Sequence, residues 1–306
     1  MGSNRFSQVG VYIGKCFRIF WHEKGWKVVL FGAIISAIIA WVPGDKMFVY
    51  KVNTKNGAFA IVCACIWIGL FNSIQSICRE RKIIKREHRT GLHISSYILA
   101  HMIYELCICF IQSIIMVLAL FIFRNNIPKS GVILPGLLEL FISCLLIMYA
   151  SDVLGIAVSS FVKNENAAMA AMPFVLIIQL VLAGIIFELE GSVNAVSNVT
   201  ISKWGVQAIC STCDINHMQD AFTVLQIETE EEQMEEALDR DLKDSEIEDI
   251  EEKYMDQQLE DDERTDDAYD SSPGVLLSCW MIMIVYTILY GVISVLALKM
   301  VDKDKR

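Results

Sequence analysis

Two cysteines separated by two residues form the most evident reactive pair in the sequence. Cys210 and Cys213 stand in the stretch ICSTCDINH, with His217 four residues further on. A structural zinc site needs four ligands, and the sequence offers no second pair with this spacing. We therefore expect two thiols or a disulfide here, depending on how oxidising their compartment is, and no metal.

Ionisable side chains also stand inside apolar stretches, where carboxyl and imidazole groups can carry protons. His101 and Glu105 belong to one such stretch, and Glu139 and Asp152 belong to another. Acids within a membrane usually face protein or a water-filled cavity rather than lipid. A proton relay is one interpretation, but both stretches are long enough to place their ends near water. We favour structural partners near the interface.

The sequence shows no recognisable machinery for hydrolysing ATP. The stretch GVYIGK, from Gly10 to Lys15, resembles a phosphate-binding loop, but it has three residues between its glycines instead of four. Cys16 stands where a Ser or Thr would bind magnesium. We expect no catalytic residue, no metal and no cofactor on this chain.

Long apolar segments would have to position these groups. The chain has 306 residues, of which 54% are hydrophobic. Since a bilayer core needs about 20 apolar residues per helix, we predict an all-α, multi-pass membrane protein with six transmembrane helices. The predicted spans are Trp26–Pro43, Ala58–Cys78, Tyr97–Phe123, Gly131–Val162, Ala167–Phe187 and Val275–Leu298. The first is short and the fourth is long, so a tilt or a break is expected in both.

The more polar segments complete the predicted organisation. Apolar and basic residues alternate at helical spacing before the first span, which favours an amphipathic helix along the inner interface. The predicted regions are an amphipathic helix at 1–25, five spans at 26–187 with a cytoplasmic segment at 79–96, an extracellular region of short or re-entrant helices at 188–272 that includes an acidic helical insert at 226–270, and the last span with a cytoplasmic tail at 273–306.

Charge is divided unequally along the chain. The net charge is −10, yet residues 189–272 contain 25 Asp/Glu against 5 Lys/Arg. The segments assigned to the inside carry 16 Lys/Arg, against 5 in the two short outside loops. This bias predicts a cell-membrane protein with both termini in the cytoplasm. We favour a solvated acidic hairpin or partly disordered segment for the insert, and the alternative is a cap for cationic substrates or an outside partner protein.

The most basic stretch, CRERKIIKREHRTGLHISSY, lies between the second and third spans at residues 78–97. Glu80, Arg81, Arg86 and Glu87 can form ion pairs across adjacent turns, and Gly91 is suited to end a helix. Anchoring by positive charge alone needs neither ordered acids nor a glycine. The pattern therefore favours a rigid elbow on which a motor protein can push.

This stretch resembles the connection between the second and third helices in ABC exporter permeases of the G-subfamily, or type-2, fold. The matching residues are Glu80, Arg81, Arg86, Glu87, Gly91 and Tyr97. Residues 154–189 are similar to the fourth-to-fifth helix region of bacterial members, and residues 201–209 to the segment before the last helix. One departure is Cys107, which stands where the family often has a proline. The resemblance covers nearly the whole chain except residues 226–270.

The resemblance implies a permease that works with an ATPase. The N-terminal helix would be the connecting helix, and residues 80–92 would dock on a separate ATPase subunit that binds ATP and magnesium. The permease would form a dimer with a second copy or a paralogue, with a substrate path between the second and fifth helices. The implied path residues are Trp67, Phe71, Asn72, Gln75, Pro173, Leu176, Gln179 and Leu180.

Two functions remain open from the sequence. The first is the membrane-spanning, non-enzymatic subunit of an ATP-driven exporter, which moves a hydrophobic, lipid-like or peptide substrate out of the cell. The alternative is a membrane sensor or anchor whose acidic extracellular segment binds a ligand or partner. In either case we expect contact with membrane lipid and none with nucleic acid.

Overall fold

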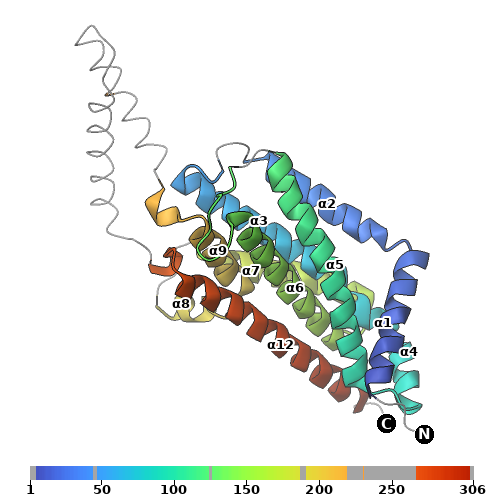
Figure 1. Ribbon diagram of the computed structural model, residues 1–306. Helices are drawn as coiled ribbons and strands as arrows, with labels where there is room; N and C mark the ends of the chain where they lie inside the picture. Colours follow the sequence, from blue (N-terminus) through green and yellow to red (C-terminus); the bar gives the residue numbers. More distant parts are fainter. Residues whose placement is uncertain are drawn as a thin grey trace.

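The computed structural model describes residues 5–43, 47–123, 126–186, 191–218, 230 and 267–303. These residues form helices and loops, without a strand among them (Figure 1). The α-helices are α1 (Arg5–His22), α2 (Trp26–Trp41), α3 (Lys51–Ser73), α4 (Ser76–Arg89), α5 (Ile94–Ile122), α6 (Gly136–Phe161), α7 (Glu165–Val181), α8 (Gly191–Ser197), α9 (Ile201–Thr212) and α12 (Pro273–Lys303). Two short 3₁₀ helices, η2 (Ile215–His217) and η3 (Asp267–Tyr269), lie beside α9 and α12 in the chain.

Four helical stretches of the described chain are long and apolar enough to cross a bilayer. One is Lys51–Arg89, which runs through α3 and α4, and the others are α5, α6 and most of α12. α1 and α2 form a pair bent by 73°, which would make a fifth if counted as one span. The structure thus confirms an all-helical protein with about four to five apolar spans. It does not confirm the predicted count of six, because α2 has only 16 residues and α7 only 17.

Several helix boundaries differ from the predicted ones because of Pro and Gly residues. α6 begins after Pro135 rather than at residue 131, since proline lacks the N–H that a preceding turn would need. α7 ends at Val181, before Gly184, whose φ of +79° is a backbone conformation that favours glycine. Asn164 caps the start of α7 as a helix N-cap does, accepting a hydrogen bond from the N–H of Ala167 at 2.9 Å.

α6 lies at the centre of the bundle, where it packs against α3, α5, α9 and α12 (Figure 1). Glycines bring α3 and α6 especially close together. A Cβ atom added at Gly69 would lie 2.3 Å from the carbonyl oxygen of Met148, and one added at Gly155 would lie 2.3 Å from Ser73 Oγ. Close backbone approach through small residues is a common way for membrane helices to pack.

A second buried cluster joins one end of the bundle. Ile77 and Ile84 of α4 pack with Tyr97 at the start of α5, Leu298 near the end of α12 and Tyr12 of α1. These helix ends therefore lie together, while α8 and α9 lie towards the opposite end (Figure 1). Of the predicted acidic insert, all but residues 230 and 267–270 falls outside the described residues.

Candidate functional site

α4 is a short helix that is fixed at both ends. The hydroxyl oxygen of Ser159, on α6, accepts hydrogen bonds from the N–H groups of Ile77 at 3.1 Å and Cys78 at 3.0 Å. These are N–H groups of the first turn, which have no partner within the helix. At the other end Gly91 adopts a φ of +110°, as expected for a residue that ends a helix, and the N–H of Leu92 donates back to the Glu87 carbonyl at 3.1 Å.

Arg81 connects α4 to the last turn of α6. Its guanidinium group donates hydrogen bonds to the carbonyl oxygens of Ser160, at 3.3 Å, and Val162. The last carbonyl groups of a helix lack partners within that helix, so a cation is favourable here. Arg81 therefore holds two helices together.

The two acids of α4 bind neighbouring helices. The carboxylate of Glu80 accepts hydrogen bonds from Lys15 Nζ on α1 and from the Tyr97 hydroxyl on α5, both at 2.9 Å. The carboxylate of Glu87 accepts one from the Tyr12 hydroxyl at 2.6 Å. These acids do not form the predicted ion pairs along α4, because the half-buried Tyr12 and Lys15 of α1 and the buried Tyr97 of α5 bind them instead.

The α1 side of this contact was missed at the sequence level. Gln8, Tyr12 and Lys15 lie on one face of α1, at intervals of four and three residues. Gln8 Nε2 donates to the Gly91 carbonyl at 3.1 Å, and Gln8 Oε1 accepts from the N–H of His93 at 3.1 Å. Polar residues at helical spacing along this amphipathic helix were the available signal. Burial, helped by Glu87, raises the pKa of Tyr12, so its phenol remains a neutral donor.

We expect Glu80→Gln to loosen α1 from α4. In the ion pair with Lys15, the Glu80 side chain is 15% exposed and the Lys15 side chain is 29% exposed. We therefore expect the variant to lose about 1 kcal/mol of stability. The measurement is thermal unfolding of the purified protein at low and high salt. Lys82→Gln, on the exposed face of α4, is the control and should change stability by less than about 0.5 kcal/mol. Equal losses in the two variants would contradict the proposed contact.

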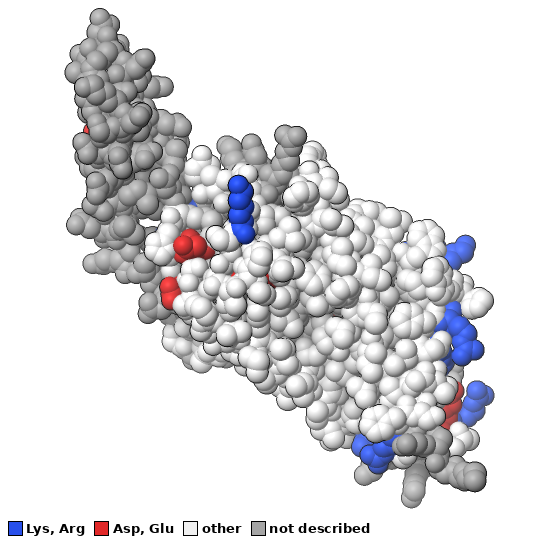
Figure 2. Space-filling view, viewed as in Figure 1, with Lys and Arg blue, Asp and Glu red and all other residues white. Residues whose placement is uncertain are grey.

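The outward face of α4 carries cations and one apolar side chain. The side chains of Lys82, Arg86 and Arg89 are exposed and form no hydrogen bond or ion pair with other described residues. Ile83 lies among them and is 41% exposed. Figure 2 shows Lys and Arg side chains gathered at the end of the molecule that carries α1 and α4, while the middle of this face carries neither sign of charge. We call Lys82, Ile83, Arg86 and Arg89 the basic face.

Comparison with known proteins identifies the membrane body. Residues 7–212 match the model of the ABC-2 type transporter family. The chain belongs to this family. It also matches the ABC transporter ATP-binding/permease protein Rv1747 of Mycobacterium tuberculosis, with 26% identity over 223 residues. That match covers 69% of this chain but 26% of the relative, so the chain spans about a quarter of that protein's length.

The predicted path residues of this ABC-2 permease on α3 have other helices as neighbours. The ring of Phe71 packs on that of Phe31 in α2, with centroids 4.8 Å apart. Asn72 forms two hydrogen bonds with the amide of Gln112 on α5, at 2.7 and 3.1 Å. Trp67 is exposed, and Gln75 is half-buried just before α4.

On α7 the predicted path residues also divide between different faces. Pro173 is exposed, and Leu176 and Leu180 are half-buried. Gln179 is buried, and its side-chain oxygen accepts hydrogen bonds from the N–H groups of Ile201 at 3.0 Å and Ser202 at 3.1 Å. Gln179 therefore caps the start of α9. The substrate path stays a prediction, and for Gln179 the structure shows a helix-capping contact.

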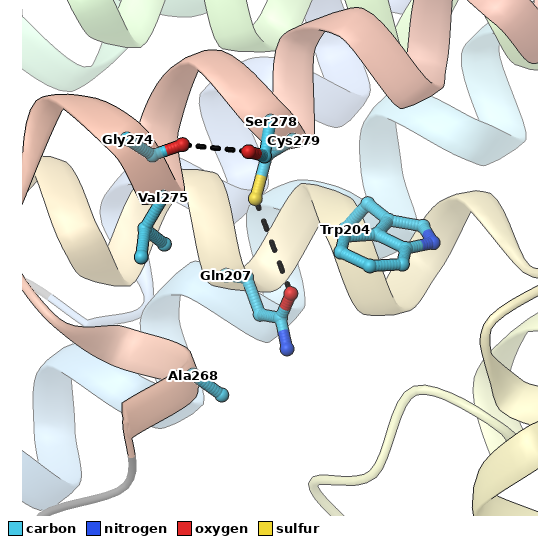
Figure 3. A pocket seen from close by; sticks show the side chains of 7 residues that line it. All are labelled: Trp204, Gln207, Ala268, Gly274, Val275, Ser278 and Cys279. Carbon is cyan, nitrogen blue, oxygen red and sulfur yellow. Dashed lines mark hydrogen bonds between the residues drawn. The ribbon is translucent and has the colours of Figure 1, made fainter.

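A cavity of about 290 Å³ lies between α9, η3 and α12, away from the predicted path residues. Figure 3 shows Gln207 at its base, with Cys279 donating a hydrogen bond to the Gln207 amide oxygen at 3.9 Å and Trp204 to one side. Val275 and Ala268 add apolar surface, and the Ser278 hydroxyl, which donates to the Gly274 carbonyl at 2.7 Å, adds a further polar group. The lining carries no charged side chain, and its thiol and hydroxyl are hydrogen-bonded to Gln207 and Gly274 rather than to a general base, so it offers no activated nucleophile.

Cys210 and Cys213 lie at the end of α9 and are both buried thiols. Burial, with smaller contributions from Cys210 and Glu139, raises the pKa of Cys213 well above its ordinary value. A thiol that resists ionisation is a poor metal ligand and a slow nucleophile. The disulfide between the two cysteines stays a prediction.

Proposed function

We propose that this ABC-2 permease is the membrane-spanning subunit of an ATP-driven exporter, and that the basic face of α4 docks on a separate ATPase subunit. The observation that carries the proposal is the attachment of α4. Its outward residues remain available, whereas Glu80, Arg81 and Glu87 bind three neighbouring helices. A docking element must be rigidly joined to the bundle if it is to transmit movement.

The composition of the basic face indicates the chemistry of its partner. Three cations surround the exposed Ile83, so the matching surface of the ATPase should be acidic and contain an apolar hollow. Complementary charge of this kind speeds association and fixes orientation, while a buried apolar anchor supplies affinity. ATP and magnesium would bind to that partner chain.

The membrane arrangement belongs to the same proposal. The end that carries α4 faces the cytoplasm of a cell-membrane protein, together with both termini, and α2 and α7 also cross the bilayer. Two copies, or one copy and a paralogue, assemble so that a hydrophobic, lipid-like or peptide substrate passes between α3 and α7. The exposed apolar face of α7 supports a partner there, since Phe174 is 70% exposed.

Charge reversal on the basic face tests this function. The protein is purified with the ATPase that it captures, and ATP hydrolysis is measured with and without the permease. Arg86→Glu is expected to weaken binding of the ATPase about tenfold, because the loss of a charge pair worth about 1.4 kcal/mol has that effect on a dissociation constant. Permease-dependent hydrolysis should fall by a similar factor when the ATPase is below saturation. Lys129→Glu is the control, because it reverses an exposed charge outside α4.

The midpoint of thermal unfolding should be the same for both variants and the wild type. If the permease captures no ATPase, or if the two variants behave alike, the docking proposal is wrong. Capture of an external ligand by residues 226–270 without any ATPase would support the sensor or anchor instead.

A further inference from the structure

Four buried residues form a polar column along one face of α5. Tyr97, His101, Glu105 and Cys109 follow one another at intervals of four residues, which places them on the same side of the helix. The column begins at the α4 end, where the Tyr97 hydroxyl binds Glu80, and the ring centroids of Tyr97 and His101 lie 4.6 Å apart. We call these four residues the α5 column.

Asp152 of α6 meets the far end of the α5 column. The Cys109 thiol donates a hydrogen bond to Asp152 Oδ2 at 3.4 Å, and Ser73 of α3 donates to the Asp152 backbone carbonyl at 2.6 Å. Asp152 is fully buried, and its other carboxyl oxygen, Oδ1, has no hydrogen-bond partner. His101 Nδ1 is likewise buried without a partner.

No cation from the surrounding helices compensates these acids. α5 and α6 contain no Lys or Arg, α3 has none after Lys55, and α12 has none before Lys299. Lys15 of α1 lies at the α4 end, paired with Glu80, and Arg18 of α1 and Lys27 of α2 are exposed. The titratable groups around the two acids are Cys16 from α1, His101, Tyr104 and Cys109 from α5, and Tyr149 from α6. All of these are neutral in their ordinary state or when buried.

We propose that Asp152 and Glu105 form a proton-binding site within the bundle, reached along the α5 column. A buried carboxylate without a counter-charge is very costly, and binding a proton removes that cost. A proton on Asp152 also turns an oxygen without a partner into a donor. The ligand of this site is therefore the proton, and the site is protonated when α3, α5 and α6 are closely packed.

Proton uptake at this site is a simple acid–base step. When water reaches the acids, a carboxylate oxygen takes a proton from hydronium and forms an O–H bond. The hydronium becomes water, and no oxidation state changes. Closing the bundle around the neutral acid then costs little. Reopening reverses the step and returns the proton to water.

The proposal fixes the sign of a pH dependence. The packed bundle holds protons that the same carboxyl groups have already lost at neutral pH in the unfolded chain, where they titrate at about pH 4. The stabilisation is therefore fully present at low pH and is lost as pH rises. For each proton held, the ratio of packed to unfolded protein should fall roughly tenfold per pH unit.

Infrared spectroscopy of the purified full-length permease tests the site without any ATPase. Exposed carboxyl groups are ionised at about pH 7.5, so an absorption band of protonated carboxyl groups at that pH comes from buried acids. We expect the wild type to show this band and Asp152→Asn to lose part of it. Glu139→Gln is the matched control, because Glu139 is equally buried but accepts three backbone hydrogen bonds, and it should leave the band unchanged.

Thermal unfolding from about pH 6 to about pH 8 provides the second measurement. The wild-type slope should decrease in Asp152→Asn or Glu105→Gln and persist in Glu139→Gln. If Asp152→Asn fails to fold, the wild-type band and the Glu105→Gln variant still decide the question. Absence of the band in the wild type, or a band and slope unaffected by both variants, would overturn the proposal. Because no ATPase takes part, these outcomes are independent of the docking proposal.

Discussion

Gly69→Val is expected to cost about 3 kcal/mol or more and to remove most of the correctly folded permease. The Cβ of the new side chain would lie 2.3 Å from the Met148 carbonyl oxygen and 3.0 Å from the Asp152 nitrogen. Both are backbone atoms of α6, which cannot move aside as a flexible side chain can. The helices must therefore separate. Overpacking of a tightly packed core typically costs about 1–3 kcal/mol, and because backbone must shift here we expect a loss of about 3 kcal/mol or more.

The measurement is the monodisperse yield after purification, with the midpoint of thermal unfolding. Gly14→Ala is the control, because no atom lies within 4 Å of a Cβ added at this position of α1. Alanine favours helices over glycine, so this variant should be unchanged or slightly more stable. A normal yield for Gly69→Val would contradict the close packing of α3 and α6.

Glu139→Ala is expected to produce the second large loss, also of about 3 kcal/mol or more. The carboxylate of this fully buried residue accepts hydrogen bonds from the N–H groups of Val132 at 3.1 Å, Ile133 at 2.6 Å and Leu134 at 2.8 Å. These three bonds are partly buried, and the loss of a hydrogen bond to a carboxylate costs about 1.5–3 kcal/mol. Thermal unfolding gives the loss, and amide hydrogen exchange at residues 132–134 should become faster.

Two comparisons make this prediction specific. Glu139→Gln retains one acceptor oxygen and should lie between the wild type and the alanine variant. Glu165→Ala removes an exposed acid from the first turn of α7 and should cost less than about 1 kcal/mol. If Glu165→Ala is as harmful as Glu139→Ala, the hydrogen bonds to the loop before α6 do not have the proposed importance.

Hydrophobicity predicted the helices well but their ends less reliably. α5 and α12 lie within a few residues of their predicted spans because both are long and mainly apolar. The predicted second span began at Ala58, whereas α3 begins at Lys51, because its polar first two turns are helical without being hydrophobic. Such ends depend on contacts with other helices, which hydropathy does not describe.

The candidate site was predicted in part for a similar reason. The positions of Arg86 and Gly91 follow from local sequence, since one is an exposed cation and the other ends a helix. The α1 partners of Glu80 and Glu87 lie 65 and 75 residues away in the chain and could not be deduced from spacing within α4. Gln179 was predicted at the substrate path, but its contact with α9 depends on how the chain returns after α7.

The helical stretch Lys51–Arg89 joins the basic face to the far end of the bundle within 39 residues. At 1.5 Å per residue, such a stretch is about 58 Å long. If it turns as a stiff lever, a tilt of about 5° applied at α4 would displace the other end by about 5 Å. A displacement of that size is comparable to one helical turn. If the proposed ATPase docks on the basic face, a small swing of that subunit would therefore be enough to move the far end of the bundle by one turn.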